Sequence, residues 1–339
     1  TQNDGTLADG NFPLSITKNA DYRAAVVEND LFILNASYLY LYSLHGDLKE
    51  TRQLAYSKPI LKSNDYFALL YENGGTRFRV DRQSGNVYTK TMDQAIITGA
   101  ISSTGVVALV TESDLYSCVL QIFDKNGKKL YTRNCIERLS DIAFNEDSAV
   151  YRPDGKMQAV FAELSALDGD VTATLKCIQF DTTDYTWESE PLTTLSLALS
   201  LTENNHACVI GDTTCAYYDD KGNLESQYDY GGTLENYAVD AGNAAVLIRD
   251  EEKRETKLVI FPGSASEPIE IVVNGDAKAV QVYGDRVYMM NAETVIAYNF
   301  SGKAVATVRL DSTYDSFLKK DNYLFLLRYD KIDRVDFKE

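Results

Sequence analysis

The chain has 339 residues, of which 45% are hydrophobic and 24% are charged, so it carries enough apolar side chains to fold throughout. Its formal net charge of −17 argues against nucleic acid and against anionic lipid as partners, because both favour a basic surface. No apolar run approaches the roughly 18 residues that a membrane-spanning helix needs, so we expect no transmembrane segment.

A first series of short turns, rich in Gly, Asn and Asp, recurs along the chain. Its members are residues 28–30, 63–65, 103–105, 153–155, 203–205, 241–243, 283–285 and 320–322. Such residues tolerate a positive φ or cap a turn, and each turn is followed by an apolar run that favours a strand. Each member therefore predicts a tight connection between the inner two strands of one repeat.

A second series runs in step with the first and predicts the connection between the outer two strands of each repeat. Its members are residues 44–47, 83–86, 125–128, 182–184, 220–223, 262–264 and 300–303. A repeat of about 40 residues built from strands and tight turns is typical of a β-propeller blade. We therefore expect an all-β, eight-bladed β-propeller. Seven blades is the alternative if the fourth repeat, which is lengthened around residues 164–170, is miscounted.

The two ends of the chain complement each other. The last repeat has three strands, the third at residues 331–337, and lacks an outer strand, whereas residues 12–17 form a spare extended segment before the first repeat. We expect this N-terminal segment to complete the last blade and close the ring, which hides both strand edges. Residues 1–10 are expected to be disordered, and residues 11–339 to form a single propeller domain.

One pair of cysteines supports a prediction about register. If Asn126 and Gly127 form the favoured two-residue hairpin loop, Cys118 and Cys135 face each other across two strands. They then fall in a non-hydrogen-bonded pair, where side chains approach closest, and this geometry permits a disulfide.

The same count about Gly211 and Asp212 places Cys208 opposite Cys215, in a hydrogen-bonded pair that favours a disulfide less. Cys177 is left unpaired. The alternative is that all five cysteines are buried and reduced, and act as small hydrophobic residues.

Three outer hairpins resemble the repeat of quinoprotein-type (PQQ-like) and WD40-like propellers, in which an Asp precedes a Thr/Ser-Gly turn and a Trp docks between blades. These hairpins are residues 80–88 (VDRQSGNVY), 123–131 (FDKNGKKLY) and 180–187 (FDTTDYTW). The quinone-dependent enzymes of this superfamily carry a vicinal Cys pair and a Trp platform. This chain has no Cys-Cys dipeptide, and Trp187 occupies a docking position. It is closer in character to the non-enzymatic envelope scaffolds and to uncharacterised secreted or membrane-anchored bacterial propellers.

No motif predicts catalysis, so we expect no catalytic residue, no bound metal and no cofactor. The two histidines, His45 and His206, have no spacing that would pair them as metal ligands. Asp168 and Asp170 lack the further acids of a calcium loop, so a plain turn is favoured there. The alternative is a carbohydrate-active enzyme, in which carboxylates and tyrosines converge on the mouth of the central channel.

The function expected from these observations is a non-catalytic scaffold that binds a protein or a cell-envelope polymer. The expected binding loops are three longer connections, marked by Glu72 and Thr76, Asp168 and Asp170, and Glu251 and Arg254. The chain begins with Thr1 rather than Met. We therefore expect an extracytoplasmic protein, secreted or anchored through a removed N-terminal segment, with a trimmed cytoplasmic protein as the alternative. A monomer is expected.

Overall fold

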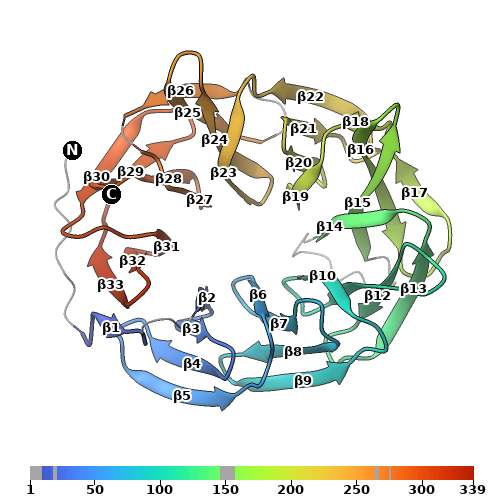
Figure 1. The fold of residues 1–339 in the computed structure, drawn as a ribbon, viewed down its shortest axis with the longest axis horizontal. Helices are drawn as coiled ribbons and strands as arrows, with labels where there is room; N and C mark the ends of the chain where they lie inside the picture. The colour runs from blue at the N-terminus through green and yellow to red at the C-terminus, as the bar shows by residue number, and fades with distance from the viewer. Residues whose placement is uncertain (1–9, 18–20, 146–156, 264–266, 275) are drawn as a thin grey trace.

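The structure is a computed structural model that describes residues 10–17, 21–145, 157–263, 267–274 and 276–339. Within these residues the protein is all-β, and its strands form eight separate sheets arranged as a ring around a central channel (Figure 1). The prediction of an eight-bladed β-propeller is therefore confirmed. No helix in the described part of the chain is long and apolar enough to cross a membrane.

The first four blades follow one another in chain order. Blade 1 contains β2 (Arg23–Val27), β3 (Asp30–Leu34), β4 (Tyr38–Ser43) and β5 (Leu48–Gln53). Blade 2 contains β6 (Pro59–Ser63), β7 (Ala68–Glu72), β8 (Arg77–Arg82) and β9 (Gly85–Thr91). Blade 3 contains β10 (Ile96–Ile101), β11 (Val107–Thr111), β12 (Cys118–Phe123) and β13 (Lys129–Cys135). Blade 4 contains β14 (Arg138–Phe144), β15 (Gln158–Leu167), β16 (Asp170–Gln179), β17 (Tyr185–Glu188) and the short β18 (Leu192–Thr193), which also pairs with β16.

The remaining four blades complete the ring. Blade 5 contains β19 (Ser196–Leu201), β20 (Ala207–Gly211), β21 (Thr214–Tyr218) and β22 (Leu224–Asp229). Blade 6 contains β23 (Thr233–Asp240), β24 (Asn243–Asp250), β25 (Glu255–Phe261) and β26 (Ile269–Val273). Blade 7 contains β27 (Ala279–Tyr283), β28 (Arg286–Met290), β29 (Thr294–Asn299) and β30 (Ala304–Arg309). Blade 8 contains β31 (Ser316–Lys320), β32 (Tyr323–Leu327), β33 (Lys331–Asp336) and β1 (Leu14–Ser15).

The first strand of each blade lies nearest the channel, and the strands of a blade pair in chain order toward the outside (Figure 1). Because neighbouring strands are antiparallel, the turns after the first and third strands open on one face of the ring, here called the turn face. The turns after the second strands and the links between blades open on the other, here called the link face.

The predicted turn series agree with these strands. Seven members of the first series connect the first and second strands of a blade, and the eighth, at residues 153–155, lies outside the described residues. The second series falls at the connections between the third and fourth strands, except that Gly85 and Asn86 already belong to β9 and Ser264 lies outside the described residues. The lengthened fourth repeat is a long hairpin, since β15 and β16 have 10 residues each.

Ring closure is confirmed. In β1, Leu14 pairs with Ile332 and Ser15 with Lys331, and the Ile16 amide donates to the Asp330 carbonyl at 2.8 Å. The N-terminal segment thus supplies the missing fourth strand of blade 8. The predicted disorder of residues 1–10 falls mostly on residues 1–9, which lie outside the described part of the chain.

The expected register of Cys118 and Cys135 is confirmed, because the two residues are direct partners across β12 and β13. The predicted turn was nevertheless wrong. Asp124 receives hydrogen bonds from Asn126 and Lys128 and closes a three-residue loop with Gly127 at φ 86°, and a bulge then restores the register.

The register expected for Cys208 and Cys215 was wrong. Cys208 pairs with Tyr217 and Cys215 with Ile210, because the loop of this hairpin is Asp212 and Thr213, one residue later than expected. The two cysteines are therefore diagonal neighbours rather than direct partners.

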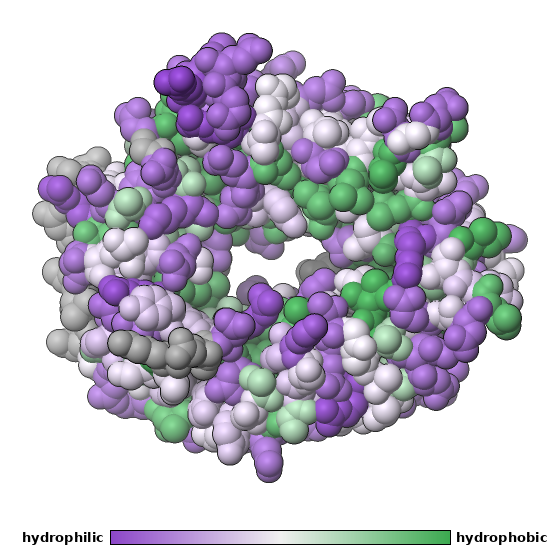
Figure 2. Space-filling view, in the orientation of Figure 1, coloured by the Kyte–Doolittle hydropathy of each residue, from purple (hydrophilic) through white to green (hydrophobic). Residues whose placement is uncertain are grey.

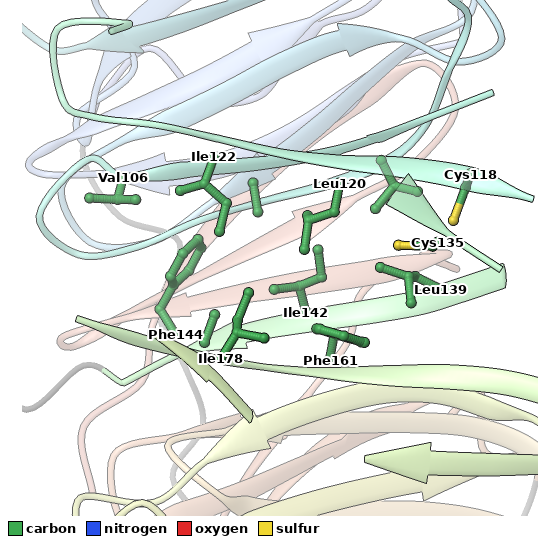
Figure 3. Close-up of a cluster of buried hydrophobic side chains, with 13 residues drawn as sticks. Val106, Cys118, Leu120, Ile122, Cys135, Leu139, Ile142, Phe144, Phe161 and Ile178 are labelled. Atoms are coloured by element: carbon green, nitrogen blue, oxygen red, sulfur yellow. The ribbon is translucent and has the colours of Figure 1, made fainter. Parts of the chain in front are cut away.

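The apolar cores lie between neighbouring blades rather than within them. Figure 3 shows the cluster between blades 3 and 4, in which Leu120 and Ile122 of β12 pack against Ile142 and Phe144 of β14. Each blade presents alternate residues to the blade on either side, and the middle strands are consequently buried on both faces. This packing makes the ring one continuous body and leaves the loops on its two faces free for other roles.

Candidate functional site

The three predicted binding loops all follow the second strand of a blade, so they share the link face, but they belong to blades 2, 4 and 6 and do not come together. In blade 2, the Glu72 carboxylate is buried, lies 2.6 Å from the Arg77 guanidinium and accepts from the Ser57 amide. The Arg77 guanidinium lowers the pKa of Glu72. Thr76 is half-buried. The Glu72 carboxylate is therefore used to hold the fold.

The loop of blade 6 is an exposed, charged projection. Glu251 and Arg254 lie at the tip of the β24–β25 hairpin, and Figure 2 shows this tip as a strongly hydrophilic protrusion at the top of the ring. Glu251 lies 3.8 Å from Arg249 in an exposed ion pair, which contributes little to stability.

The loop of blade 4 has a different surface. Asp168 and Gly169 form a two-residue turn with φ of 52° and 89°, the positive values that Asp-Gly hairpins accommodate. Asp168 and Asp170 are exposed, and so are the apolar neighbours Leu167 and Val171. The tip therefore presents apolar side chains beside carboxylates.

Blade 3 adds exposed apolar residues next to this tip. On the link face, Leu115 is 86% exposed and Ile136 is 83% exposed, and Tyr116 is also exposed. The Ser117 amide donates to the Cys135 carbonyl at 3.0 Å, and the Ser117 hydroxyl donates to the Ile136 carbonyl, so these two loops lie against each other.

A further contact joins the two blades. Ser165, near the tip of β15, donates to the Glu137 carboxylate at 3.5 Å. Figure 2 shows apolar residues gathered at the right of the ring, over blades 3 and 4. We name the exposed apolar residues of these link-face loops on the blade 3 side, Leu115, Tyr116, Ile136 and Leu167, the blade 3–4 surface; by the alternation of β16, Val171 faces blade 5.

The charges around the blade 3–4 surface are mainly negative. Asp114, Glu137 and Asp168 are the sequence neighbours of its apolar residues, and Asp170 pairs with Leu167. The nearby cation Arg138 is already 3.0 Å from the Glu112 carboxylate. An apolar centre with an acidic rim is thus the most distinctive surface among the described residues.

The predicted thiol pair lies directly beneath these loops. Cys118 and Cys135 are buried at the ends of β12 and β13, both are free thiols, and Figure 3 shows their sulfur atoms at one end of the apolar cluster beside Leu139. The hydrogen bond that the two thiols share lowers the pKa of Cys118 to about 7 and raises that of Cys135. Of the other cysteines, Cys177 is buried, and burial raises its pKa to about 11.

The central channel contains the other candidate site. A cavity of about 630 Å³ is lined by residues of blades 1, 2, 6, 7 and 8, among them Asp21, Tyr22, Asp315 and Tyr329. Burial raises the pKa of Tyr22 to about 12, and its hydroxyl donates to the Arg328 carbonyl at 2.7 Å. Both carboxylates are exposed, so neither has the desolvated surroundings that favour a general acid.

Two carboxyl groups on inner strands do have raised pKa values. Burial raises the pKa of Asp141, whose oxygens accept from the Ile142 and Leu199 amides at 2.8 Å each. Asp141 thereby ties blade 4 to blade 5. Desolvation by the surrounding protein raises the pKa of Asp240, and the negative charge of Asp65 raises it further. No group of three or more His, Cys, Asp or Glu suited to a metal ion occurs among the described residues.

The blade 4 tip and the thiol pair were among the residues expected from the sequence, whereas Leu115 and Ile136 were not. The available signal was an apolar residue inside each of two polar loops, 113–117 and 136–138. That signal is weak, because single exposed apolar residues are common on protein surfaces.

Comparison with known proteins supports the fold. A family model described as "Family of unknown function (DUF5711)" matches residues 12–337. No curated protein matches the chain. Among solved structures, the computationally designed Ika8 protein is similar with a TM-score of 0.66 and 14% identity, over 95% of this chain and 98% of that one.

Two natural propellers are also similar. BamB from Moraxella catarrhalis has a TM-score of 0.57 and 11% identity, over 98% of this chain and 100% of that one. BBS1N, solved in complex with ARL6DN, has a TM-score of 0.55 and 11% identity, over 100% of this chain and 98% of that one. At these identities the likeness establishes the architecture alone.

Proposed function

The chain belongs to the DUF5711 family, whose function is unknown, and we propose that it is a non-catalytic, extracytoplasmic scaffold that binds another protein through the blade 3–4 surface. One observation carries this proposal: large exposed apolar side chains lie on neighbouring link-face loops of two blades, and the Ser117–Ile136 and Ser165–Glu137 hydrogen bonds hold these loops together. A group of exposed apolar residues that is rimmed by polar residues is a mark of a protein interaction site.

The acidic rim favours one kind of occupant. Asp114, Glu137, Asp168 and Asp170 would attract lysine or arginine, and the net charge of −17 adds a long-range attraction for a basic partner. The partner that fits is a protein segment whose apolar side chains are flanked by Lys or Arg. BBS1N in its complex with ARL6DN is an instance of a propeller that binds a protein.

The extracytoplasmic location rests on the cysteines. Cys118 and Cys135 face each other across β12 and β13, an arrangement that permits a disulfide. Disulfides persist in oxidising compartments and are rare in the cytosol. We propose that Cys118 and Cys135 are linked in the native protein.

The binding proposal is tested with labelled model peptides. A helical Leu/Lys peptide should bind the purified protein in a fluorescence anisotropy titration, and a Leu/Glu peptide of the same length should not. The double variant Leu115→Ser/Ile136→Ser should weaken binding about tenfold or more, since each apolar side chain contributes about 1.5–3 kcal/mol when fully buried. Leu48→Ser/Leu224→Ser removes two similarly apolar, exposed residues on outer strands and should leave binding unchanged.

Equal binding by the two double variants, or equal binding of the Leu/Lys and Leu/Glu peptides, would overturn the assignment. Retention on an insoluble neutral polysaccharide that survives Leu115→Ser/Ile136→Ser would favour an envelope polymer over a protein as the partner.

A second candidate function, hydrolysis of a carbohydrate, is favoured by the two carboxylates and two tyrosines of the channel cavity. Turnover on a panel of glycans that is abolished by Asp21→Asn or Asp315→Asn would establish this function. Absence of turnover by the wild-type protein on the same panel would leave the scaffold as the proposed function.

A further inference from the structure

A separate cavity lies on the turn face, between blades 4 and 5, and plays no part in the proposed protein interface. Its volume is about 220 Å³. Blade 4 contributes Gln158, Cys177 and Trp187, and blade 5 contributes Asn205 and Asp220 from its two turns. Ligand sites for drug-sized molecules have about 300–1,000 Å³, so this cavity suits a single small ring.

The position of the indole in this cavity is fixed by packing. Trp187 lies in β17 opposite Cys177, and its six-membered ring rests on Gly222 in the β21–β22 turn. A Cβ at position 222 would lie only 2.4 Å from the Cε3 atom of Trp187, so a glycine is required for this approach. The contact also holds the neighbouring Asp220 beside the indole.

The polar groups that line the cavity are mostly unused by the fold. Within the described part of the chain, the side chains of Asn205 and Asp220 make no hydrogen bond, and the Trp187 indole N–H has no acceptor. Gln158 accepts only a long contact of 3.8 Å from the Cys177 thiol. The cavity therefore offers free donors, on two amides and the indole, together with free acceptors, on the same amides and a carboxylate.

These groups select among ligand classes. Lys, Arg and His are absent from the described lining, so nothing there would neutralise an anion. An ammonium ion could bind the acceptors but not the amide and indole donors, so it would use fewer of the lining groups. A ring that carries several hydroxyl groups both donates and accepts, and its C–H groups can pack against the indole.

We infer that this cavity binds a neutral monosaccharide unit, either free or at the end of a glycan. Among the described lining residues Asp220 is the one carboxylate, whereas hydrolysis of a glycosidic bond generally uses two. The site therefore recognises the sugar without cleaving it. This inference does not depend on the blade 3–4 surface, which lies on the opposite face of the ring.

The chain provides its own probe, because Trp187 is its single tryptophan. Titration of the purified protein with neutral hexoses and N-acetylhexosamines should change the intrinsic fluorescence in a saturable way. Inorganic phosphate and tetramethylammonium, which test the anion and cation alternatives, should leave it unchanged. A saturable response to either ion with none to the sugars would overturn the inference.

Variants localise the response. Asn205→Gly removes the amide and keeps the positive φ of 63°, and Asp220→Ala removes the carboxylate. Each should weaken sugar binding about tenfold, the expected effect of losing a hydrogen bond in a confined site. Asn204→Gly is the matched control, since Asn204 is exposed and does not line the cavity. Equal affinity in all three variants, or no response to any sugar in the wild-type protein, would remove the assignment.

Discussion

Large apolar side chains are buried at the seam where blade 8 meets blade 1, but they are exposed on the blade 3–4 surface. At the seam, Phe12 and Leu14 are 9% and 6% exposed, and they pack on Phe325 and Ile332. On the blade 3–4 surface, Leu115 and Ile136 are 86% and 83% exposed. Apolar residues that hold the ring closed are thus distinct from those that the ring exposes on its link face.

The charges differ in the same way. At the seam, the guanidinium of Arg334 is buried, lies 4.2 Å from the Tyr323 ring centroid and 5.4 Å from that of Phe12, and donates to the Leu44 carbonyl. Around the blade 3–4 surface, Asp114, Asp168 and Asp170 are exposed to solvent. Perturbing the seam should therefore change stability, and perturbing the blade 3–4 surface should change binding.

Deleting residues 10–17 is expected to have the largest effect on stability. The deletion removes β1 and the Phe12 side chain, which exposes the edge of β33 and the apolar cluster of the seam. We expect a loss of about 5 kcal/mol or more, because truncating one buried Phe or Leu alone costs about 2–5 kcal/mol. Thermal denaturation followed by circular dichroism measures this change, and an unchanged melting temperature would contradict the closure role.

Oxidation of Cys118 and Cys135 should stabilise the blade 3–4 loops by about 3 kcal/mol in the chain-entropy model, because the bond closes a loop of moderate length. Oxidised glutathione can accept the two electrons, giving two reduced glutathione molecules while the thiols lose two protons and form the disulfide. Denaturant unfolding of the oxidised and reduced protein measures the difference.

The rate of this oxidation should depend on pH. Since the hydrogen bond from Cys135 lowers the pKa of Cys118 to about 7, the Cys118 thiolate forms at lower pH than an ordinary thiolate, and the rate should rise with a midpoint near that value. In Cys135→Ala this hydrogen bond is lost, so the midpoint for mixed-disulfide formation at Cys118 should move to higher pH. Identical midpoints would show that the two thiols do not interact.

Arg334→Met should destabilise the protein by about 2 kcal/mol, less than the deletion. The substitution keeps much of the apolar contact but loses the cation–π contacts and the hydrogen bond to the Leu44 carbonyl. Arg23→Met is a suitable control, because Arg23 is an exposed arginine at the channel mouth. Equal melting temperatures for the two variants would mean that Arg334 does not hold the seam.

Leu115→Ser/Ile136→Ser should have the smallest effect on stability, within about 0.5 kcal/mol of the wild-type protein, because exposed side chains contribute little to folding. The same variant should lose peptide binding, as described above. A large drop in melting temperature would show that Leu115 and Ile136 stabilise the fold. They would then not differ from the apolar residues of the seam.

Much of the architecture was predictable because it is encoded locally. Turn residues such as Gly105, Gly127 and Gly242 adopt a positive φ, which glycine allows without steric cost. In the strands, successive side chains point to opposite faces of the sheet. Counting these signals predicted eight blades, and the incomplete last repeat predicted that residues 12–17 pair with residues 331–337, as Leu14 and Ile332 do.

The register of the strand pairs was harder to predict, because moving a turn by one residue changes the partner of every residue in the hairpin. Asp212 and Thr213 form the loop that was expected at Gly211 and Asp212, which moved Cys208 and Cys215 from direct partners to diagonal neighbours. The Cys118–Cys135 pairing survived because a bulge in β13 compensated for the three-residue turn.

The candidate sites depended on tertiary structure. Leu115 and Leu167 lie in different repeats, and Trp187 and Asp220 line one cavity from neighbouring blades. Their proximity follows from the angle and spacing of adjacent blades, which interdigitating side chains between sheets decide and which no local pattern in the sequence specifies. The sequence by itself determined how many blades form and how the ring closes. Only the packed ring decided which loops meet, and therefore where the proposed partner and the proposed sugar would bind.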